Sequence, residues 1–108
     1  MPEIGTIQTA PPGASDDVVN AGVRYAEERL GRHELPMPSG EVGGQAIEFA
    51  IGALEGRVVP VRAAEQFVEQ VVVAAAMREV NDEPPLTASD IRLFRDVSTW
   101  FFNSFWHE

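Results

Sequence analysis

The residues that could do chemistry in this chain are few and stand apart from one another. It has two histidines and no cysteine, so the side chains that most often ligate metals or act as nucleophiles are scarce. Helical bundles often hold metals through a Glu-x-x-His motif. The position that this motif assigns to glutamate is occupied by Leu30 before His33 and by Ser104 before His107. The sequence therefore predicts no metal site and no bound cofactor.

Nucleophilic catalysis has no better support. Ser15 and Ser39 stand where a serine caps a helix, and the chain has no Gly-x-Ser-x-Gly motif, P-loop or dinucleotide fingerprint. The glycine-rich stretch 40–44 lacks the lysine and the spacing that a phosphate-binding loop needs. Glu27 and Glu28 are adjacent and point to different sides of a helix. We therefore predict that the protein is not an enzyme, and keep a small enzyme or ligand carrier with a pocket between helices as an alternative.

The chain's aromatic residues are concentrated near its end. The stretch 89–106 holds six of the nine aromatic side chains. At about 100° per residue, its apolar side chains cover roughly 240° of a helix surface, against the stripe of about 100° that one core face requires. Two interpretations follow: a central helix wrapped by its neighbours, or a helix that also contacts another chain. The candidate interface residues are Trp100, Phe101, Phe102, Phe105 and Trp106.

The excess of apolar surface favours a role in binding other proteins. Aromatic side chains are enriched where protein partners anchor. We therefore expect a non-catalytic interaction module that docks through its C-terminal helix. Its partner is expected to be a second copy of the chain or a different protein, as in a homo-oligomer or the small subunit of a larger assembly.

The charge balance bears on other kinds of partner. Seventeen acidic residues face eight basic ones, all arginine, and the net charge is −9. DNA, RNA and anionic membranes would repel such a molecule, so we expect no direct nucleic-acid or membrane binding. An acidic inhibitor that imitates DNA remains an alternative function. The acids that could form its surface are Glu41, Glu48, Glu55, Glu65 and Glu69.

The expected location is the cytoplasm. No basic segment followed by an apolar one opens the chain, and the absence of cysteine excludes a disulfide framework. The longest uncharged apolar run, 71–77, is far shorter than the roughly twenty residues that a membrane span needs.

The elements that must position these residues are predicted to be four helices in one domain. Prolines and glycines in 1–14 predict a flexible arm, and the domain is expected to cover 15–108. Ser15 and Ser39 are expected to cap the first two helices, with Gly31 and Gly56 as their left-handed stops. The expected class is an all-α, four-helix bundle-like domain.

The second and third helices are expected to form much of the core. In the second, 42–54, a centre of small residues lies between larger ones, so a bulky side chain such as Phe101 or Phe105 could pack there; self-association through the same face is the alternative. The third, about 61–80, is amphipathic at first and apolar on most sides later, so we expect its second half to be covered. Its consecutive valines leave a strand at 57–61 or 70–74 as a further alternative.

The last helix has a well-defined predicted start. Thr87 is expected to be its N-cap, with Asp90 reaching back to the Thr87 amide, while Leu86 and Ile91 pack together as a hydrophobic staple. Shortly before it, Arg78 falls within the buried stripe of the third helix. Either its long stem reaches water from the last helical turn, or it is enclosed and pairs with an acid such as Asp90 or Asp96.

Overall fold

The described part of the chain folds into four helices, as expected from the sequence. The structure, a computed structural model, describes residues 15–57 and 59–106, with the backbone alone for 98–106. The predicted arm, 1–14, lies outside the described residues, and the helical path of 70–74 excludes the strand considered there. The helices are α1 (Asp16–Arg32), α2 (Gly40–Leu54), α3 (Val61–Val80) and α4 (Ala88–Trp106).

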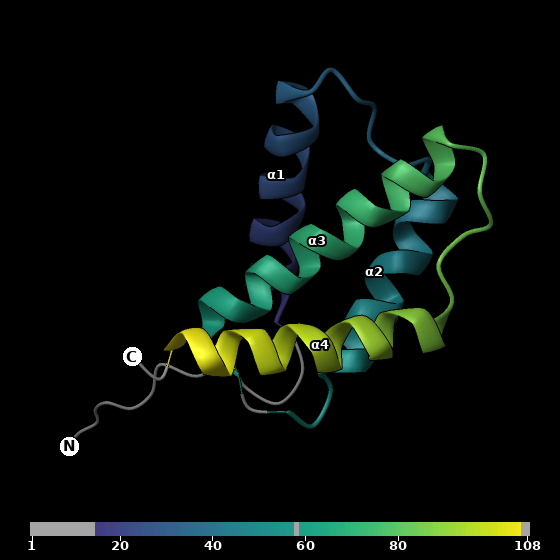
Figure 1. Cartoon of the computed structure of the whole chain (residues 1–108). Helices are drawn as coiled ribbons and strands as arrows, with labels where there is room; N and C mark the ends of the chain where they lie inside the picture. The colour runs from purple at the N-terminus through teal and green to yellow at the C-terminus, as the bar shows by residue number, and fades with distance from the viewer. Residues whose placement is uncertain (1–14, 58, 107–108) are drawn as a thin grey trace.

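Helix α3 is the centre of the domain. It crosses the molecule diagonally, and α1, α2 and α4 each pack against it, while α2 also packs against α4 (Figure 1). Its buried residues recur along one continuous face, as the amphipathic pattern predicted. They are Ala63, Ala64, Phe67, Val68, Val71, Val72, Ala75 and Ala76.

The apolar surface of α3 is not covered along its whole second half, contrary to the sequence-based expectation. Val72 and Ala76 are each 1% exposed, but Met77 and Val80 are 38% and 46% exposed. The reason is that the buried face keeps the same direction along the helix, and Met77 and Val80 turn away from it. Apolar surface therefore remains open at the C-terminal end of α3.

The predicted small-residue face of α2 is confirmed. Gly43, Ala46, Ala50 and Ala53 are all buried, and α2 packs against both α3 and α4. The sequence predicts that Phe101 or Phe105 packs on this face, but the structure does not describe the side chains of these two residues. Small residues on α2 allow the neighbouring helix axes to approach closely, because little side-chain volume separates them.

The helix starts follow the predicted capping residues. The Ser15 hydroxyl accepts from the Val18 N–H at 3.3 Å, and the Ser39 hydroxyl accepts from the Val42 N–H at 3.4 Å. These side chains satisfy N–H groups that a first helical turn leaves without partners.

One predicted helix end is confirmed and another is wrong. Gly56 has a φ of 78° just after α2, as expected, but Gly31 stays within α1 and the left-handed residue is Glu34, with a φ of 58°. The shift arises because the Leu35 N–H donates to the Leu30 carbonyl at 2.9 Å, which closes the helix beyond Arg32.

Candidate interaction surface

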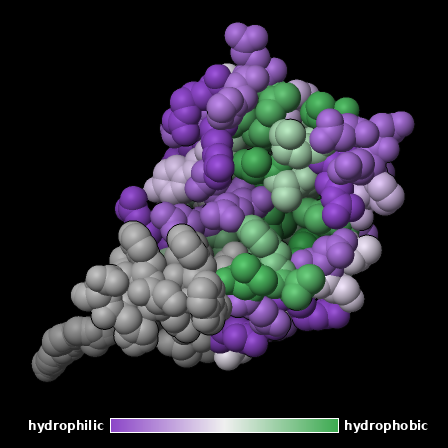
Figure 2. Space-filling view, in the orientation of Figure 1, coloured by the Kyte–Doolittle hydropathy of each residue, from purple (hydrophilic) through white to green (hydrophobic). Residues whose placement is uncertain are grey.

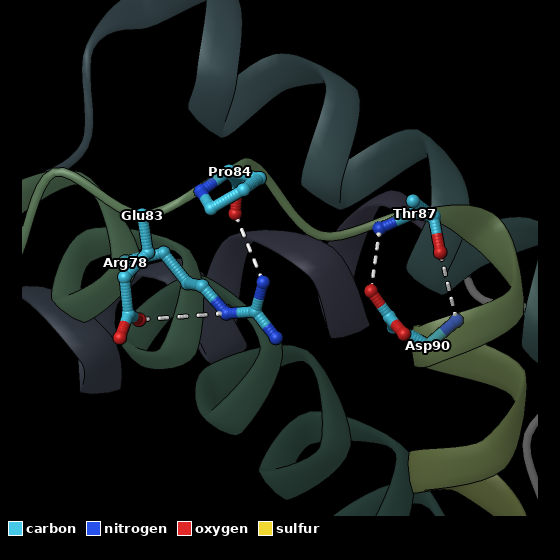
Figure 3. A network of polar contacts seen from close by, with 5 residues as sticks. All are labelled: Arg78, Glu83, Pro84, Thr87 and Asp90. Atoms are coloured by element: carbon cyan, nitrogen blue, oxygen red, sulfur yellow. Dashed lines mark hydrogen bonds and ion pairs between the residues drawn. The ribbon is translucent and has the colours of Figure 1, made fainter.

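The start of α4 is fixed by a reciprocal pair of hydrogen bonds, which confirms the predicted capping box. The Asp90 N–H donates to the Thr87 hydroxyl and the Thr87 N–H donates to the Asp90 carboxylate, both at 3.1 Å (Figure 3). Beside this cap, Leu86 is half-buried and Ile91 is only 1% exposed, and both line the same groove. The cap and these two apolar side chains therefore set where α4 leaves the loop.

The capping box is expected to add an acid-sensitive contribution to stability. The Thr87 N–H and then the Thr87 side chain favour the charged Asp90 carboxylate, with a smaller contribution from Arg78, so the pKa of Asp90 lies below its ordinary value. The stabilisation is therefore complete above the pKa that an aspartate has in the unfolded chain, about 4. It disappears as the pH falls through the lower pKa of Asp90 in the folded protein. Asp90→Asn is expected to be less stable than wild type in urea unfolding at about pH 7 and to approach it at about pH 2. An equal difference at both pH values would contradict this account.

Arg78 holds the loop that precedes α4. Its guanidinium donates to the Pro84 carbonyl at 2.9 Å and lies 3.8 Å from a Glu83 carboxylate oxygen, and its side chain is 35% exposed (Figure 3). Of the two sequence-based alternatives, the stem that reaches water is confirmed, and an enclosed ion pair with Asp90 or Asp96 is not found.

Arg95 joins α4 to the end of α2, a role that the sequence analysis missed. Its guanidinium donates to the Ala53 carbonyl at 3.0 Å and pairs with Asp96 at 2.7 Å, and its side chain is only 15% exposed. A cation suits this place because the last carbonyls of a helix carry partial negative charge. The one available signal was its position four residues after Ile91, which directs Arg95 toward the core side of the helix.

Removing the Arg95 guanidinium is expected to loosen the attachment of α4. Arg95→Met keeps most of the apolar stem, and the loss of its charged hydrogen bond to Ala53 should lower the free energy of unfolding by about 1.5 kcal/mol in urea titrations. Arg92→Met is the matched control, because Arg92 is exposed and its described contact is with Ser89 at 3.4 Å on the same helix. A similar loss in both variants would show that the tie to α2 adds nothing.

An apolar groove runs between α3 and α4. Phe94 lines this groove, which has a volume of about 360 Å³, and its ring stacks on Phe67 with ring centroids 5.7 Å apart. Two α4 residues on its rim are well exposed: Leu93 at 66% and Val97 at 58%. The groove is lined by Val71, Ala74, Arg78, Leu86, Asp90, Ile91, Leu93, Phe94 and Val97.

The groove belongs to a larger apolar region. Figure 2 shows hydrophobic side chains gathered over α3 and α4 between hydrophilic margins, on the face seen in Figure 1. A second hollow beyond the end of α3 is lined in part by Met37 and Val80, which are 36% and 46% exposed. Exposed apolar surface of this kind often marks an interaction site.

The predicted aromatic interface continues along the same helix. The backbone of Trp100, Phe101, Phe102, Phe105 and Trp106 forms the last turns of α4, while their side chains lie outside the described ones. Leu93 and Val97 precede Trp100 by about two turns and one turn of the helix. The exposed apolar surface in the described part of α4 therefore leads toward the predicted aromatic residues.

The five acids of the predicted acidic surface lie in two different settings. Glu41 and Glu48 are exposed on α2, and Glu55 is exposed directly after its last residue. Glu65 and Glu69 on α3 are half-buried and line a polar hollow shared with α1, where Glu69 lies 3.5 Å from the Arg29 guanidinium. Because Arg32 and Arg62 also line this hollow, its acidic charge is partly balanced.

No protein-family model, curated protein or solved structure matches this chain. Within residues 15–57 and 59–106, no three His, Asp or Glu side chains gather as a metal site would need. None of the helices formed by these residues combines the length and the apolar character needed to cross a membrane.

Proposed function

We propose that the protein is a non-catalytic interaction module that docks through α4, within a homo-oligomer or as the small subunit of a larger assembly. The observation that carries the proposal is the exposure of Leu93 and Val97, at 66% and 58%, on a helix whose core side is already occupied by Ile91 and Phe94. The described part of α4 thus presents apolar surface that the other described helices leave uncovered.

Covering this surface would favour association, because exposed apolar area would leave water. Fully burying an exposed leucine or valine contributes roughly 1.5–3 kcal/mol. Trp100 and Trp106 further along α4 are of the type that most often anchors protein interfaces. The proposed location is the cytoplasm. The proposed partner is a protein, because a net charge of −9 opposes direct binding to nucleic acid or to an anionic membrane.

Light scattering coupled to size exclusion, on the full chain and on complexes purified from the native source, tests this proposal. Trp100→Ala and Trp106→Ala are expected to weaken assembly while the helical circular dichroism signal stays unchanged. Val61→Ala is the control, since Val61 is an exposed apolar residue at the start of α3. A chain that is monomeric at every concentration and forms no complex in its native source would overturn the proposal.

The acidic DNA-mimic alternative has one supporting observation, the exposure of Glu41 and Glu48 on α2 and of Glu55 directly after it. The ion pair of Glu69 with Arg29 weakens it, because a mimic needs carboxylates that are free to meet a basic groove. Neutralising all five candidate glutamates should abolish binding to a DNA-processing protein if the alternative holds. Binding that survives would eliminate it.

A further inference from the structure

We propose that the groove between α3 and α4 receives an amphipathic helix of a partner protein, whose apolar side chains fill the groove and whose basic end lies over the acidic loop between α3 and α4. This inference rests on the proposed function, because it names the kind of partner that the exposed side of α4 binds. It commits to a different protein rather than to a second copy.

The shape and lining of the groove indicate a helix as the occupant. The two walls are helices, and the α4 wall runs from Asp90 to Val97, a rise of about 10 Å or two helical turns. Apolar side chains spaced at i, i+3 or i+4, and i+7 on a partner helix match that length. The floor and walls between those ends are apolar, with Ile91, Phe94 and Val71 among them.

Acidic residues gather at the end of the groove where Arg78 and Asp90 lie. Arg78, one of the residues lining the groove, also lines a neighbouring hollow together with Glu79, Asp82 and Glu83. Asp90 lines the groove itself, and the other three carboxylates lie in the hollow beside it. The Arg78 guanidinium is already engaged by Pro84 and Glu83, and the Glu79 carboxylate accepts from the Ser39 N–H at 2.8 Å, so Asp82 and Asp90 are the acids here without a basic partner in these contacts. Lysine or arginine residues at one end of the partner helix would be attracted there, and acidic residues would be repelled.

A second copy of the chain fits this groove less well than a basic partner. It has the same net charge of −9 and no lysine, so two copies repel each other at long range. Its own exposed apolar segment contains Arg92 and Arg95, but Arg95 is already bound to Asp96 and to the Ala53 carbonyl. The chemistry of the groove therefore favours a hydrophobic and basic helix from another protein.

Two synthetic peptides test the inference on the full chain. Both have leucines at i, i+4 and i+7 of a helical sequence; one has lysines at one end and the other has glutamates there. Calorimetric titration is expected to give a micromolar Kd for the lysine peptide and at least tenfold weaker binding for the glutamate peptide. Carbodiimide coupling should join the peptide lysines to Asp82 or Glu83. Equal binding of both peptides, or binding of neither, would overturn the inference.

Substitutions in the protein separate groove binding from general attraction to an acidic molecule. Leu93→Asp changes an exposed residue and is expected to weaken the lysine peptide at least tenfold. The double change Asp82→Asn, Glu83→Gln should weaken binding of the lysine peptide several-fold. The control is the double change Glu41→Gln, Glu48→Gln, which removes the same amount of charge from α2 and should leave the Kd unchanged. Equal weakening by both double changes, or no effect of Leu93→Asp, would contradict the groove as the site.

The result also distinguishes this inference from the proposed function. If Trp100→Ala disrupts an assembly while Leu93→Asp leaves peptide binding unchanged, the interaction module stands and the groove is not its helix-binding site. If the full chain forms a dimer that Leu93→Asp dissociates and the lysine peptide does not compete for, the occupant is a second copy and the inference is wrong.

Discussion

Replacing Gly22 by alanine is expected to lower the free energy of unfolding by about 2–3 kcal/mol. A Cβ atom at this position of α1 would lie 2.6 Å from the Cβ and Cγ1 atoms of Val68 and 2.8 Å from the Glu65 carbonyl oxygen. Both neighbours belong to α3, and a backbone carbonyl cannot move aside without shifting its helix. The added methyl group must therefore push α1 and α3 apart at this contact.

Urea unfolding of Gly22→Ala beside Gly44→Ala measures this effect. Gly44 lies within α2, and a Cβ there meets nothing within 4 Å. Alanine has the higher helix propensity, so Gly44→Ala should stabilise the protein by about 1 kcal/mol. The same substitution thus has opposite expected signs at the two sites. A gain of stability in both variants would contradict the close approach of α3 to Gly22 of α1.

The local features of the fold could be predicted from the sequence because they depend on residues close together in the chain. The hydroxyls of Ser15 and Ser39 cap helices as expected, and Thr87 exchanges hydrogen bonds with Asp90 three residues away. The buried faces of α2 and α3 also followed from their periodicity. These features need no knowledge of which helices are neighbours.

The features that the sequence did not predict depend on contacts between distant segments. Helical periodicity marks Val19, Val23, Ala26 and Leu30 as one apolar face of α1, and Ala26 and Leu30 are indeed buried. It does not mark Gly22, where α3 comes so close that an added Cβ would lie 2.6 Å from Val68. A glycine has no hydropathy signal that would mark such a contact. Arg95 similarly binds a carbonyl 42 residues away, a partner that no local pattern reveals.

The candidate interaction surface was predicted in part. On a helical wheel Leu93 falls at the edge and Val97 near the middle of the apolar side of α4, and this side is wider than one core requires. Leu93 and Val97 are exposed, whereas Ile91 and Phe94 pack on the core. Which apolar residues stay open depends on where α4 lies relative to α2 and α3, so helical period alone could not identify them.

Phe67→Ala is expected to have the largest effect, a loss of about 3–5 kcal/mol in the free energy of unfolding. Phe67 is 3% exposed at the centre of α3, and its ring stacks on Phe94 of α4 with an interplanar angle of 25°. Alanine would leave a cavity in the core and remove the contact with Phe94, whose side chain lines the groove. Urea unfolding of full-length Phe67→Ala measures the loss, and Phe67→Leu, which fills more of the space, should cost clearly less.

A double-mutant cycle with Phe94→Ala separates the cavity from the aromatic contact. Phe94 is only partly buried, so Phe94→Ala alone should cost less than Phe67→Ala. If the stacked pair holds α4 against α3, the double variant should lose about 1 kcal/mol less stability than the sum of the two single losses. Phe67→Ala should then also weaken peptide binding in the groove, because the wall formed by α4 loses its support from α3. Strictly additive losses with unchanged peptide affinity would mean that Phe67 fills the core without positioning the groove.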